Sequence, residues 1–312
     1  MGKYCFGVDV GGTTVKLGLF NTDGDLLEKW EIPTVTDNHG AKILPDVANS
    51  ILNKMDEREM ERDDVEGVGI GAPGPIDSEG TVYGAVNLGW GTFSIKKELQ
   101  SLLNMPVEAG NDANVAALGE MWQGGAKGYK NVILATLGTG VGGGIIVNGR
   151  ILSGATGSGG EIGHMHVNDD ETIPCNCGNC GCLEQYVSAT GIVRLAKEKL
   201  ADESRTSSLR ATEVSAKDVW DAVKAGDGLA TEVAEDFGWY LGKGLAQMAS
   251  VSNPEIFVIG GGVSKAGTVL LDYIQKYYRK YAFQGCRGAL FTLAKLGNDA
   301  GIYGAAKMVL SE

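Results

Sequence analysis

The sequence lacks an excess of positive charge. Its 312 residues include 27 lysines and arginines against 39 aspartates and glutamates, which gives a formal net charge of −12. Affinity for DNA or RNA normally begins with a basic face. We therefore expect no nucleic-acid partner. A nucleotide phosphate is not excluded, because phosphate binding needs local N–H groups and Mg²⁺ rather than a positive global charge.

Membrane and export signals are also missing from the pattern. The opening MGKYCFGVDVGG has no basic stretch followed by an apolar core, so we expect no cleavable signal. The longest uncharged run, at about 131–148, is interrupted by five glycines and is shorter than the roughly 20 residues of a membrane span. We expect this run to form buried strands, and we expect a cytoplasmic protein with no membrane partner.

No low-complexity linker divides the chain, although its length suits two packed lobes. Glycine is abundant, with 48 residues, but it shows no period of three, which excludes a collagen helix. The glycines cluster beside apolar runs instead. This placement predicts tight turns where the backbone approaches a ligand.

A pattern of strand, glycine turn, strand, turn and strand occurs twice. It is first seen at 4–10, 15–20 and 26–32, and again at 132–138, 143–147 and 150–152. The repeat is weak in identity but clear in layout, and it predicts two similar α/β lobes. Between the repeats, apolar spacing predicts a helix at about 41–60. A later helical face, with Leu229, Val233, Phe237, Leu241, Leu245 and Met248, is typical of core.

Three glycine loops follow apolar strands, and they begin at Gly11, Gly138 and Gly260. Each could be a plain hairpin turn, but three together favour backbone N–H groups that face an anion. They match neither a Walker A loop nor a Rossmann fingerprint. Asp9 ends the first strand, where a buried carboxylate is costly to ionise unless a cation meets it. It is a candidate Mg²⁺ contact, with a turn or cap aspartate as the alternative.

The segment 164–184 reads HMHVNDDETIPCNCGNCGCLE. Four thiols and two imidazoles lie within nineteen residues, and tetrahedral zinc needs four such ligands. The crowding favours a metal over disulfides in a chain without an export signal. Free or redox-active thiols are the alternative. The sequence offers more ligands than zinc requires, and the spacing alone does not select among them.

Asn111 and Asp112 stand between a short apolar strand and a helix. A carboxylate at such a position can accept a proton from an attacking hydroxyl. The neighbouring amide can both donate to and accept from a sugar hydroxyl. The alternative is a plain helix cap.

Together these features resemble the ROK family of sugar kinases, repressors and uncharacterised open reading frames, and most closely its zinc-containing bacterial glucokinases. The resemblance covers nearly the whole chain. It rests on DVGGTTVKLGLF at 9–20, APGP at 72–75, NLGW at 87–90, GNDAN at 110–114, GTGVGGG at 138–144, EIGHMHV at 161–167, CNCGNCGCLE at 175–184, IGGGVS at 259–264 and GNDAGIYGAA at 297–306. The ten residues between His164 and Cys175 are its most specific feature.

The resemblance implies an actin-like ATPase fold of the hexokinase type, in which two α/β lobes flank a cleft. It implies a smaller lobe of 1–115 plus 299–312 and a larger one of 116–298 that carries a structural zinc. Asp112 matches the family's general base. The implied sugar contacts are Asn87, Asn111, Asp112, Glu161, His164 and Glu184. The implied phosphate and Mg²⁺ region comprises Asp9, Gly11, Gly12, Thr13, Lys16, Gly138 and Thr139, with Gly261 and Gly262 near adenosine. The implied zinc ligands are His164, Cys175, Cys177 and Cys182, and Cys180 is a spare thiol.

The implied reaction is transfer of the γ-phosphoryl group of ATP to a hexose, with the 6-hydroxyl of glucose preferred. N-acetylmannosamine, mannose, fructose and allose are alternative acceptors. Zinc, lying between Glu161 and Glu184 in sequence, is expected to shape the sugar pocket rather than to perform chemistry. The family's repressors carry an additional helix-turn-helix before the core, for which we expect no room here. A non-catalytic sugar sensor and a filament-forming actin relative are the rival functions. The resemblance also implies a homodimer.

Overall fold

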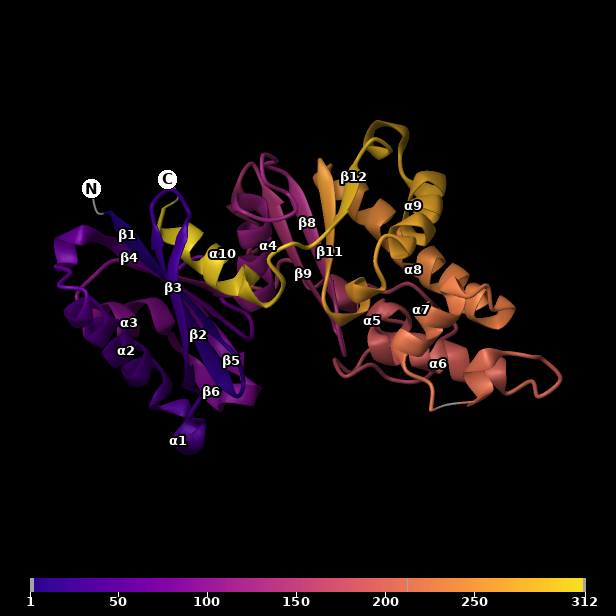
Figure 1. The fold of residues 1–312 in the computed structure, drawn as a ribbon, viewed down its shortest axis with the longest axis horizontal. Helices are drawn as coiled ribbons and strands as arrows, with labels where there is room; N and C mark the ends of the chain where they lie inside the picture. The colour runs from indigo at the N-terminus through magenta and orange to yellow at the C-terminus, as the bar shows by residue number, and fades with distance from the viewer. Residues whose placement is uncertain (1–2, 212, 311–312) are drawn as a thin grey trace. The chain divides into compact units, whose positions relative to one another are not determined.

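The computed structural model describes residues 3–211 and 213–310 (Figure 1). The strands are β1 Tyr4–Val10, β2 Thr14–Asn21, β3 Leu26–Pro33, β4 Val65–Ala72, β5 Thr81–Ala85, β6 Trp90–Ser94, β7 Val107–Asn111, β8 Val132–Leu137, β9 Val141–Val147, β10 Arg150–Ile151, β11 Ile256–Gly260 and β12 Leu290–Leu293. The α-helices are α1 Asp37–Gly40, α2 Ile43–Glu57, α3 Ile95–Leu103, α4 Asp112–Trp122, α5 Glu184–Val187, α6 Ala189–Leu200, α7 Ala216–Lys224, α8 Gly228–Ser252, α9 Val269–Tyr281 and α10 Ala300–Val309. Four of the 3₁₀ helices matter below: η2 Val86–Leu88, η3 Ile162–His164, η5 Gly262–Ala266 and η7 Gly297–Asp299.

The contacts between residues divide the chain into two compact units. The first unit comprises the chain up to Lys130, Gly144–Gly160 and the residues from Lys295 on. The second comprises Asn131–Gly143 and Glu161–Ala294. Residues 116–130 thus belong to the first unit, whereas the border expected at 115/116 would place them in the second. The reason is that α4 packs extensively against α10, which belongs to the first unit. That the chain has two lobes with the predicted borders, and that these lobes move as bodies, stays a prediction.

The two large sheets have the same strand order. One is β3-β2-β1-β4-β7 and the other is β10-β9-β8-β11-β12. In the first, β1–β2–β3 form an antiparallel meander, and β4 and β7 continue parallel to β1. In the second, β11 pairs in parallel with both β8 and β12, and β9 and β10 form an antiparallel pair. The repeat predicted from the sequence is therefore confirmed as a duplicated topology.

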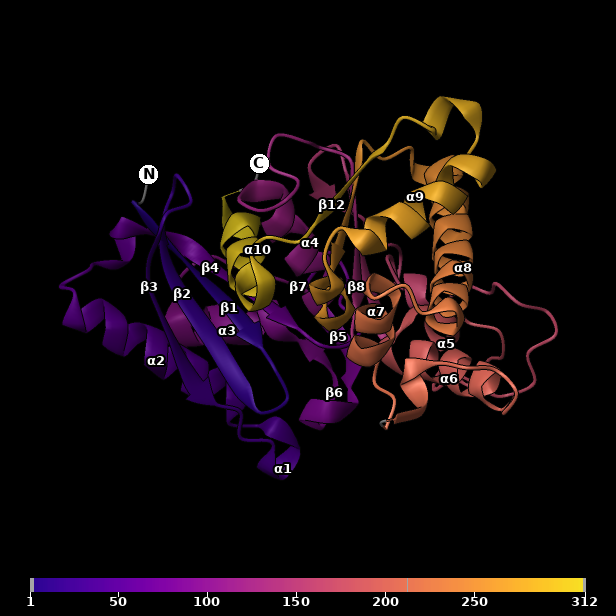
Figure 2. The ribbon, with the colours of Figure 1, turned by 45° about the vertical axis from the view of Figure 1, so that its right-hand side comes forward.

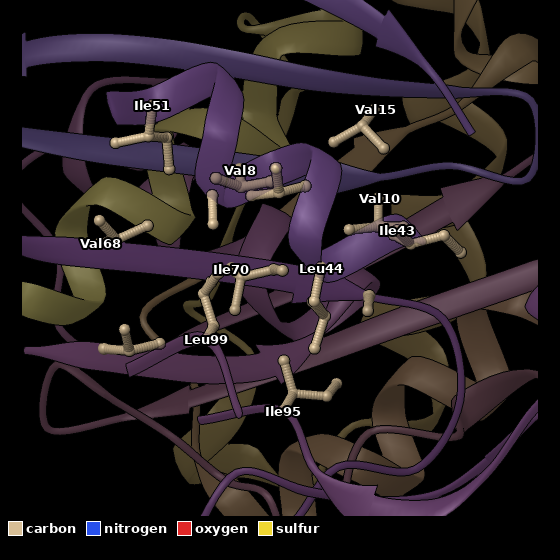
Figure 3. Packing of buried hydrophobic residues seen from close by; sticks show 14 of the residues in the cluster. Val8, Val10, Val15, Ile43, Leu44, Ile51, Val68, Ile70, Ile95 and Leu99 are labelled. Atoms are coloured by element: carbon tan, nitrogen blue, oxygen red, sulfur yellow. The ribbon is translucent and has the colours of Figure 1, made fainter. Parts of the chain in front are cut away.

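The core of the first unit lies between its sheet and the helices α2 and α3 (Figure 3). Alternation along β1 sends Val8 and Val10 to this face, because successive strand residues point to opposite sides. From α2, Ile43 and Ile51 meet them, and both are almost fully buried. The helix expected at about 41–60 is thus confirmed, with its apolar stripe against the sheet.

The opposite face of the same sheet is covered by α10, which packs on β1 and β4 (Figure 2). The approach is so close that a Cβ atom at Gly7 would lie 1.9 Å from the carbonyl oxygen of Ile302. At Gly69 a Cβ would lie 1.7 Å from the carbonyl oxygen of Ala305. Only glycine leaves room for a helix backbone at that distance. These two glycines of β1 and β4 therefore allow α10 to pack directly on the sheet.

In the second unit, β11 is buried along its whole length, and α8 packs along α9. The six residues predicted on one face of α8 are all buried, which confirms that face as core. Asn253 ends the helix in the left-handed conformation, with φ of 45°. Among the described residues, no helix has both the length and the apolar composition needed to cross a membrane.

Candidate active site

The loop between β1 and β2 is a tight glycine turn in the first unit. The N–H of Gly11 donates to the carbonyl oxygen of Thr14 at 3.0 Å, and the hydroxyl of Thr34 donates to the carbonyl oxygen of Gly11 at 2.7 Å. A Cβ atom at Gly12 would meet no other atom within 4 Å. The turn, which also includes Thr13, thus has an open face where backbone N–H groups can meet an anion.

Asp9 stands at the end of β1 beside this loop. Burial raises the pKa of its carboxyl to about 6, Lys16 lowers it and Asp112 raises it. The carboxylate packs against Gly301 of α10, where a Cβ atom would lie 2.6 Å from Asp9 Cγ. A carboxylate held in such surroundings is stabilised by a cation. The expected Mg²⁺ contact therefore fits the environment of this residue.

Lys16 lies on β2 opposite Asp9 in the antiparallel ladder. Its ammonium donates to the carbonyl oxygen of Asn298 at 3.0 Å, in the short helix η7 that leads into α10. The lysine is therefore held by the chain segment that precedes α10. The geometry keeps a positive charge at the strand ends that carry the glycine loop.

Asn111 and Asp112 form the junction between β7 and α4. Asn111 is only 9% exposed, and its side-chain oxygen accepts the N–H groups of Ala113 and Asn114 at 3.1 and 3.2 Å. Its amide nitrogen donates to the carbonyl oxygen of Gly74 at 3.1 Å. Asn111 is thus the N-cap of α4, as the alternative interpretation held.

Asp112 occupies the first position of α4, directly after this cap. It is half-buried, and the N–H of Ala113 donates to its Oδ1 at 2.7 Å. The positive end of the helix dipole favours an ionised carboxylate at this place. Asp112 and Asp9 also influence each other electrostatically, as the pKa of Asp9 shows. The predicted base and the predicted metal-binding carboxylate therefore lie near each other in one unit.

Asn87 lies in η2 of the first unit and is exposed. The next turn is set by Gly89, whose φ of 73° is left-handed and ends the short helix. Beside Asn87, the side chain of Val86 is 95% exposed. This segment therefore exposes a polar and an apolar side chain next to each other at the surface.

Two of the predicted glycine loops meet in the second unit. Gly138 and Thr139, which follow β8, and Gly262, which begins η5, line one cavity of about 560 Å³. Gly261 supports this arrangement, because its φ is 80° and a Cβ atom would lie 2.4 Å from the carbonyl oxygen of Leu137. The cavity joins loops that are more than a hundred residues apart in the chain, and its volume suits a nucleotide-sized ligand.

Another part of the wall comes from α7 and its N-cap, which no sequence pattern linked to the glycine loops, and the rest comes from Ala189 of α6 and from η5. The lining residues of α7 and its N-cap include Ser215, Ala216, Trp220, Asp221 and Lys224. Ser215 caps the helix in a capping box with Asp218. That box is visible in the sequence and marks a helix start, but no local signal says that the helix borders the glycine loops.

Glu184 connects the β8–β9 loop to the cysteine-rich segment. Its Oε2 accepts the N–H of Val141 at 2.8 Å, and its Oε1 lies 3.6 Å from Cys175 Sγ. Glu161, by contrast, is exposed at the start of η3. Of the sugar contacts expected in the second unit, Glu184 is therefore fixed by a hydrogen bond to the backbone.

The four predicted metal ligands converge in the second unit. The ligand atoms of His164, Cys175, Cys177 and Cys182 all lie within 4.8 Å of one another. Cys175 Sγ is 3.8 Å from His164 Nδ1, and Cys177 Sγ is 3.6 Å from Cys182 Sγ. Tetrahedral zinc with bonds of about 2.3 Å would hold its sulfurs roughly 3.8 Å apart. The spacing and the donor set therefore fit zinc.

The structure also selects among the surplus ligands. The ring of His166 contacts the carbonyl oxygen of Cys180 at 3.0 Å and Asp169 Oδ1 at 2.8 Å. Both His166 and Cys180 lie outside the converging group. The ligand spacing alone could not make this choice, because it depends on how the loop folds back at the bridge between His166 and Cys182. The family resemblance implied the same four ligands.

Comparison with known proteins agrees with these features. The family model described as ROK family matches residues 5–312. A glucokinase from Halalkalibacterium halodurans is 45% identical over 98% of this chain and 95% of its own length. The chain belongs to the ROK family. The α/β fold class and the actin-like ATPase type expected from the resemblance are thereby confirmed.

Solved structures of ROK proteins resemble the whole chain. A ROK family glucokinase from Streptomyces griseus, in complex with glucose and AMPPNP, has a TM-score of 0.73 and 35% identity, and 98% of each chain is covered. A ROK hexokinase from Thermus thermophilus has a TM-score of 0.79 and 31% identity, over 97% of this chain and 96% of its own. The ROK fold therefore spans both units.

Proposed function

We propose that this ROK protein transfers the γ-phosphoryl group of ATP to the 6-hydroxyl of glucose. The observation that carries the proposal is the pairing of Asp9 with Asp112, one buried at the glycine loop and the other at a helix start. A kinase needs a carboxylate that meets the metal of the nucleotide and a second one that accepts the hydroxyl proton. The glucokinases that share up to 45% identity with the chain favour glucose as the acceptor.

Asp112 is the proposed general base, which removes the proton from the attacking hydroxyl. Asp9, Lys16 and the N–H groups of the loops at Gly11 and Gly138 are proposed to hold the phosphates. Bound Mg²⁺ supplies neutralising positive charge at the transferring group. The cavity lined by Gly138, Gly262 and α7 is the proposed adenosine site.

Six side chains are proposed to contact the sugar. Asn87, Asn111 and Asp112 belong to the first unit, whereas Glu161, His164 and Glu184 belong to the second. A site that hydrogen-bonds each hydroxyl rejects an analogue that lacks one. Glu184 is held by Val141 and Asn111 by its own cap, so these two are oriented in advance.

A structural zinc is proposed at His164, Cys175, Cys177 and Cys182. The ion would hold the segment between η3 and α5, because its ligands come from both ends of that segment. Glu184 lies two residues after Cys182 and contacts Cys175. Zinc is therefore proposed to shape the sugar site without taking part in the chemistry.

The first test is ADP release by the purified protein with Mg·ATP against a panel of free hexoses, with each product identified by mass. Strong turnover that yields glucose 6-phosphate is the expected result. Turnover only on mannose, N-acetylmannosamine, fructose or allose would keep the mechanism and change the acceptor. Hexose binding without any turnover would replace the proposal by a sugar sensor.

Two expectations from the resemblance accompany the proposed reaction. The cytoplasm is the proposed compartment, because the reaction consumes ATP. A homodimer is the proposed assembly, and sedimentation at several protein concentrations is the measurement that decides it. A single monomeric species at all concentrations would remove the dimer and leave the kinase assignment untouched.

A further inference from the structure

Glu120 of α4 is a fully buried carboxylate, with 0% of the residue exposed. The N–H of Gly125 donates to its Oε2 at 2.6 Å. On the other side, the N–H groups of Lys295 and Leu296 donate to its oxygens at 2.8–3.0 Å. Its hydrogen-bond partners among the described residues are thus main-chain N–H groups from two segments far apart in the sequence.

Such an arrangement requires a group that accepts on both oxygens. An ionised carboxylate has about four acceptor sites and no donor, which suits three converging N–H groups. A glutamine at position 120 would place its side-chain NH₂ group against a main-chain N–H, so that two donors would face each other. Burial makes that mismatch costly, because a donor left without an acceptor loses its hydrogen bond to water as well.

The two segments held by Glu120 lie near two of the four points at which the chain passes between the units. The chain leaves the first unit after Lys130, re-enters it for Gly144–Gly160, and returns to it for the last time at Lys295. Glu120 holds Gly125 through its side chain and Ala126, at 3.0 Å, through its carbonyl oxygen, shortly before the exit. It holds the last return at its first two residues. One residue thus holds the first-unit side of the first exit and of the last return, which are called the two anchored crossings below.

The helix that carries Glu120 is closely packed. α4 packs against α10, and a Cβ atom at Gly119 would lie 2.2 Å from the carbonyl oxygen of Ala300. The turn after α4 closes over the carboxylate, since a Cβ atom at Gly124 would lie 2.1 Å from Glu120 Oε2. Glu120 therefore ties the two anchored crossings to the packed pair of helices α4 and α10.

We propose that Glu120 is a positioning residue of the kinase reaction, which sets how hexose binding and nucleotide binding are coupled across the two anchored crossings. The inference rests on the proposed function, because it supposes that both ligands act on one protein. When the first ligand changes the conformation of the protein, the crossings move while one end of each stays fixed. The change at the site of the second ligand therefore has a defined geometry. Without the anchor, the crossings adjust and the coupling is lost.

The test measures the dissociation constant of glucose with and without saturating AMPPNP, in the wild type, Glu120→Gln and Glu120→Asp. In the wild type the ratio of the two constants is expected within the usual range of about 5–150. Both variants are expected to lower that ratio at least about threefold and to lower kcat more than they change KM. Affinity for AMPPNP alone should stay unchanged, because the residues that Glu120 holds, Gly125, Lys295 and Leu296, are not among those proposed to bind adenosine or the phosphates.

Leu99→Ala is the matched control, since it loses stability at a buried site of α3 outside the crossings. It should lower the melting temperature and leave the coupling ratio at the wild-type value. Glu120→Asp keeps the charge and serves if Glu120→Gln does not fold. An unchanged ratio in a folded Glu120 variant, or an equal loss in Leu99→Ala, overturns the proposal. A wild type that binds another hexose is measured with that hexose, so failure of the glucose assignment is seen separately.

Discussion

Asp9 and Lys16 are directly opposite each other in the β1–β2 ladder, one carboxylate and one ammonium at the mouth of a glycine turn. The pair does not cancel the cost of burying the acid, because burial outweighs Lys16 and raises the pKa of Asp9 to about 6. The strand end is therefore prepared for an additional cation. This relationship gives the most direct physical test of the phosphate site.

The pH dependence of stability should carry the signature of Asp9. Because its folded pKa of about 6 exceeds the ordinary value of 3.8, stability contributed by the protonated form is present below pH 4 and is lost as the pH rises to about 6. Ionisation in the fold costs at most about 3 kcal/mol. Asp9→Asn should therefore gain stability relative to the wild type as the pH rises from 4 to 7, as measured by urea unfolding. A constant difference across that range would contradict the assignment. The same variant should lose kinase activity.

Asp112→Asn should remove the proposed base while keeping the fold. The loss expected in kcat is about 10²–10⁴-fold, with little change in the affinity for glucose. Asp56→Asn on the exposed side of α2 is the control for the loss of one negative charge. Turnover at the wild-type rate in Asp112→Asn would mean that another group accepts the proton.

The metal cluster predicts a difference between two neighbouring cysteines. Cys177→Ser should lose bound zinc and lower the free energy of unfolding by several kcal/mol, because metal binding contributes to folding. Cys180→Ser should retain one zinc per chain and the wild-type stability, since Cys180 lies outside the converging ligands. Elemental analysis and thermal unfolding measure both. Equal zinc content in the two variants would sink the proposed ligand set.

A substitution in α7 can block the proposed adenosine cavity without changing any residue of the first unit. Ala216→Trp places a large side chain in the cavity wall and should raise the dissociation constant of AMPPNP at least tenfold. Ala225→Trp, at the opposite end of α7, is the control and should bind AMPPNP normally. Glucose affinity, measured by calorimetry without nucleotide, should be the same in both. Normal AMPPNP binding by Ala216→Trp would place adenosine elsewhere.

The packing of α10 against α4 leaves no room for an additional methyl group. A Cβ atom at Gly304 would lie 1.7 Å from the carbonyl oxygen of Val115, so Gly304→Ala should lower the free energy of unfolding by about 3 kcal/mol or more. At Gly288 nothing lies within 4 Å, and Gly288→Ala should stay within about 0.5 kcal/mol of the wild type. Urea unfolding distinguishes them, and equal midpoints would disprove the tight contact.

Local patterns predicted much of the fold. The meander of β1–β3, the helix α2 and the buried face of α8 follow from spacings of two and 3.6 residues, which burial imposes on strands and helices. Asn111 was recognised beside a helix start, because cap residues act over two or three positions. These features are set within a few residues of the chain, and one sequence is enough to see them.

Features that depend on distant partners could not be predicted in the same way. Spacing alone did not separate His164 from His166, and only the family resemblance did, because the choice depends on which ring the folded loop brings to the three cysteines. The wall that α7 gives to the nucleotide cavity joins segments far apart in the chain. Glu120 looked like any helical glutamate, since the N–H groups that it accepts come from residues up to 176 positions away. Such roles become visible only in three dimensions.

The contact of α10 with β1 also bears on how the chain folds during synthesis. Gly7 and Ile302 are almost 300 residues apart. At a synthesis rate of roughly 5–20 residues per second, α10 is therefore made about 15–60 s after the strand that it covers. Until then one face of the first sheet stays open, while residues 131–294 have already emerged. The nascent protein therefore completes its second unit before its first, and the helix made last closes the sheet that was made earliest.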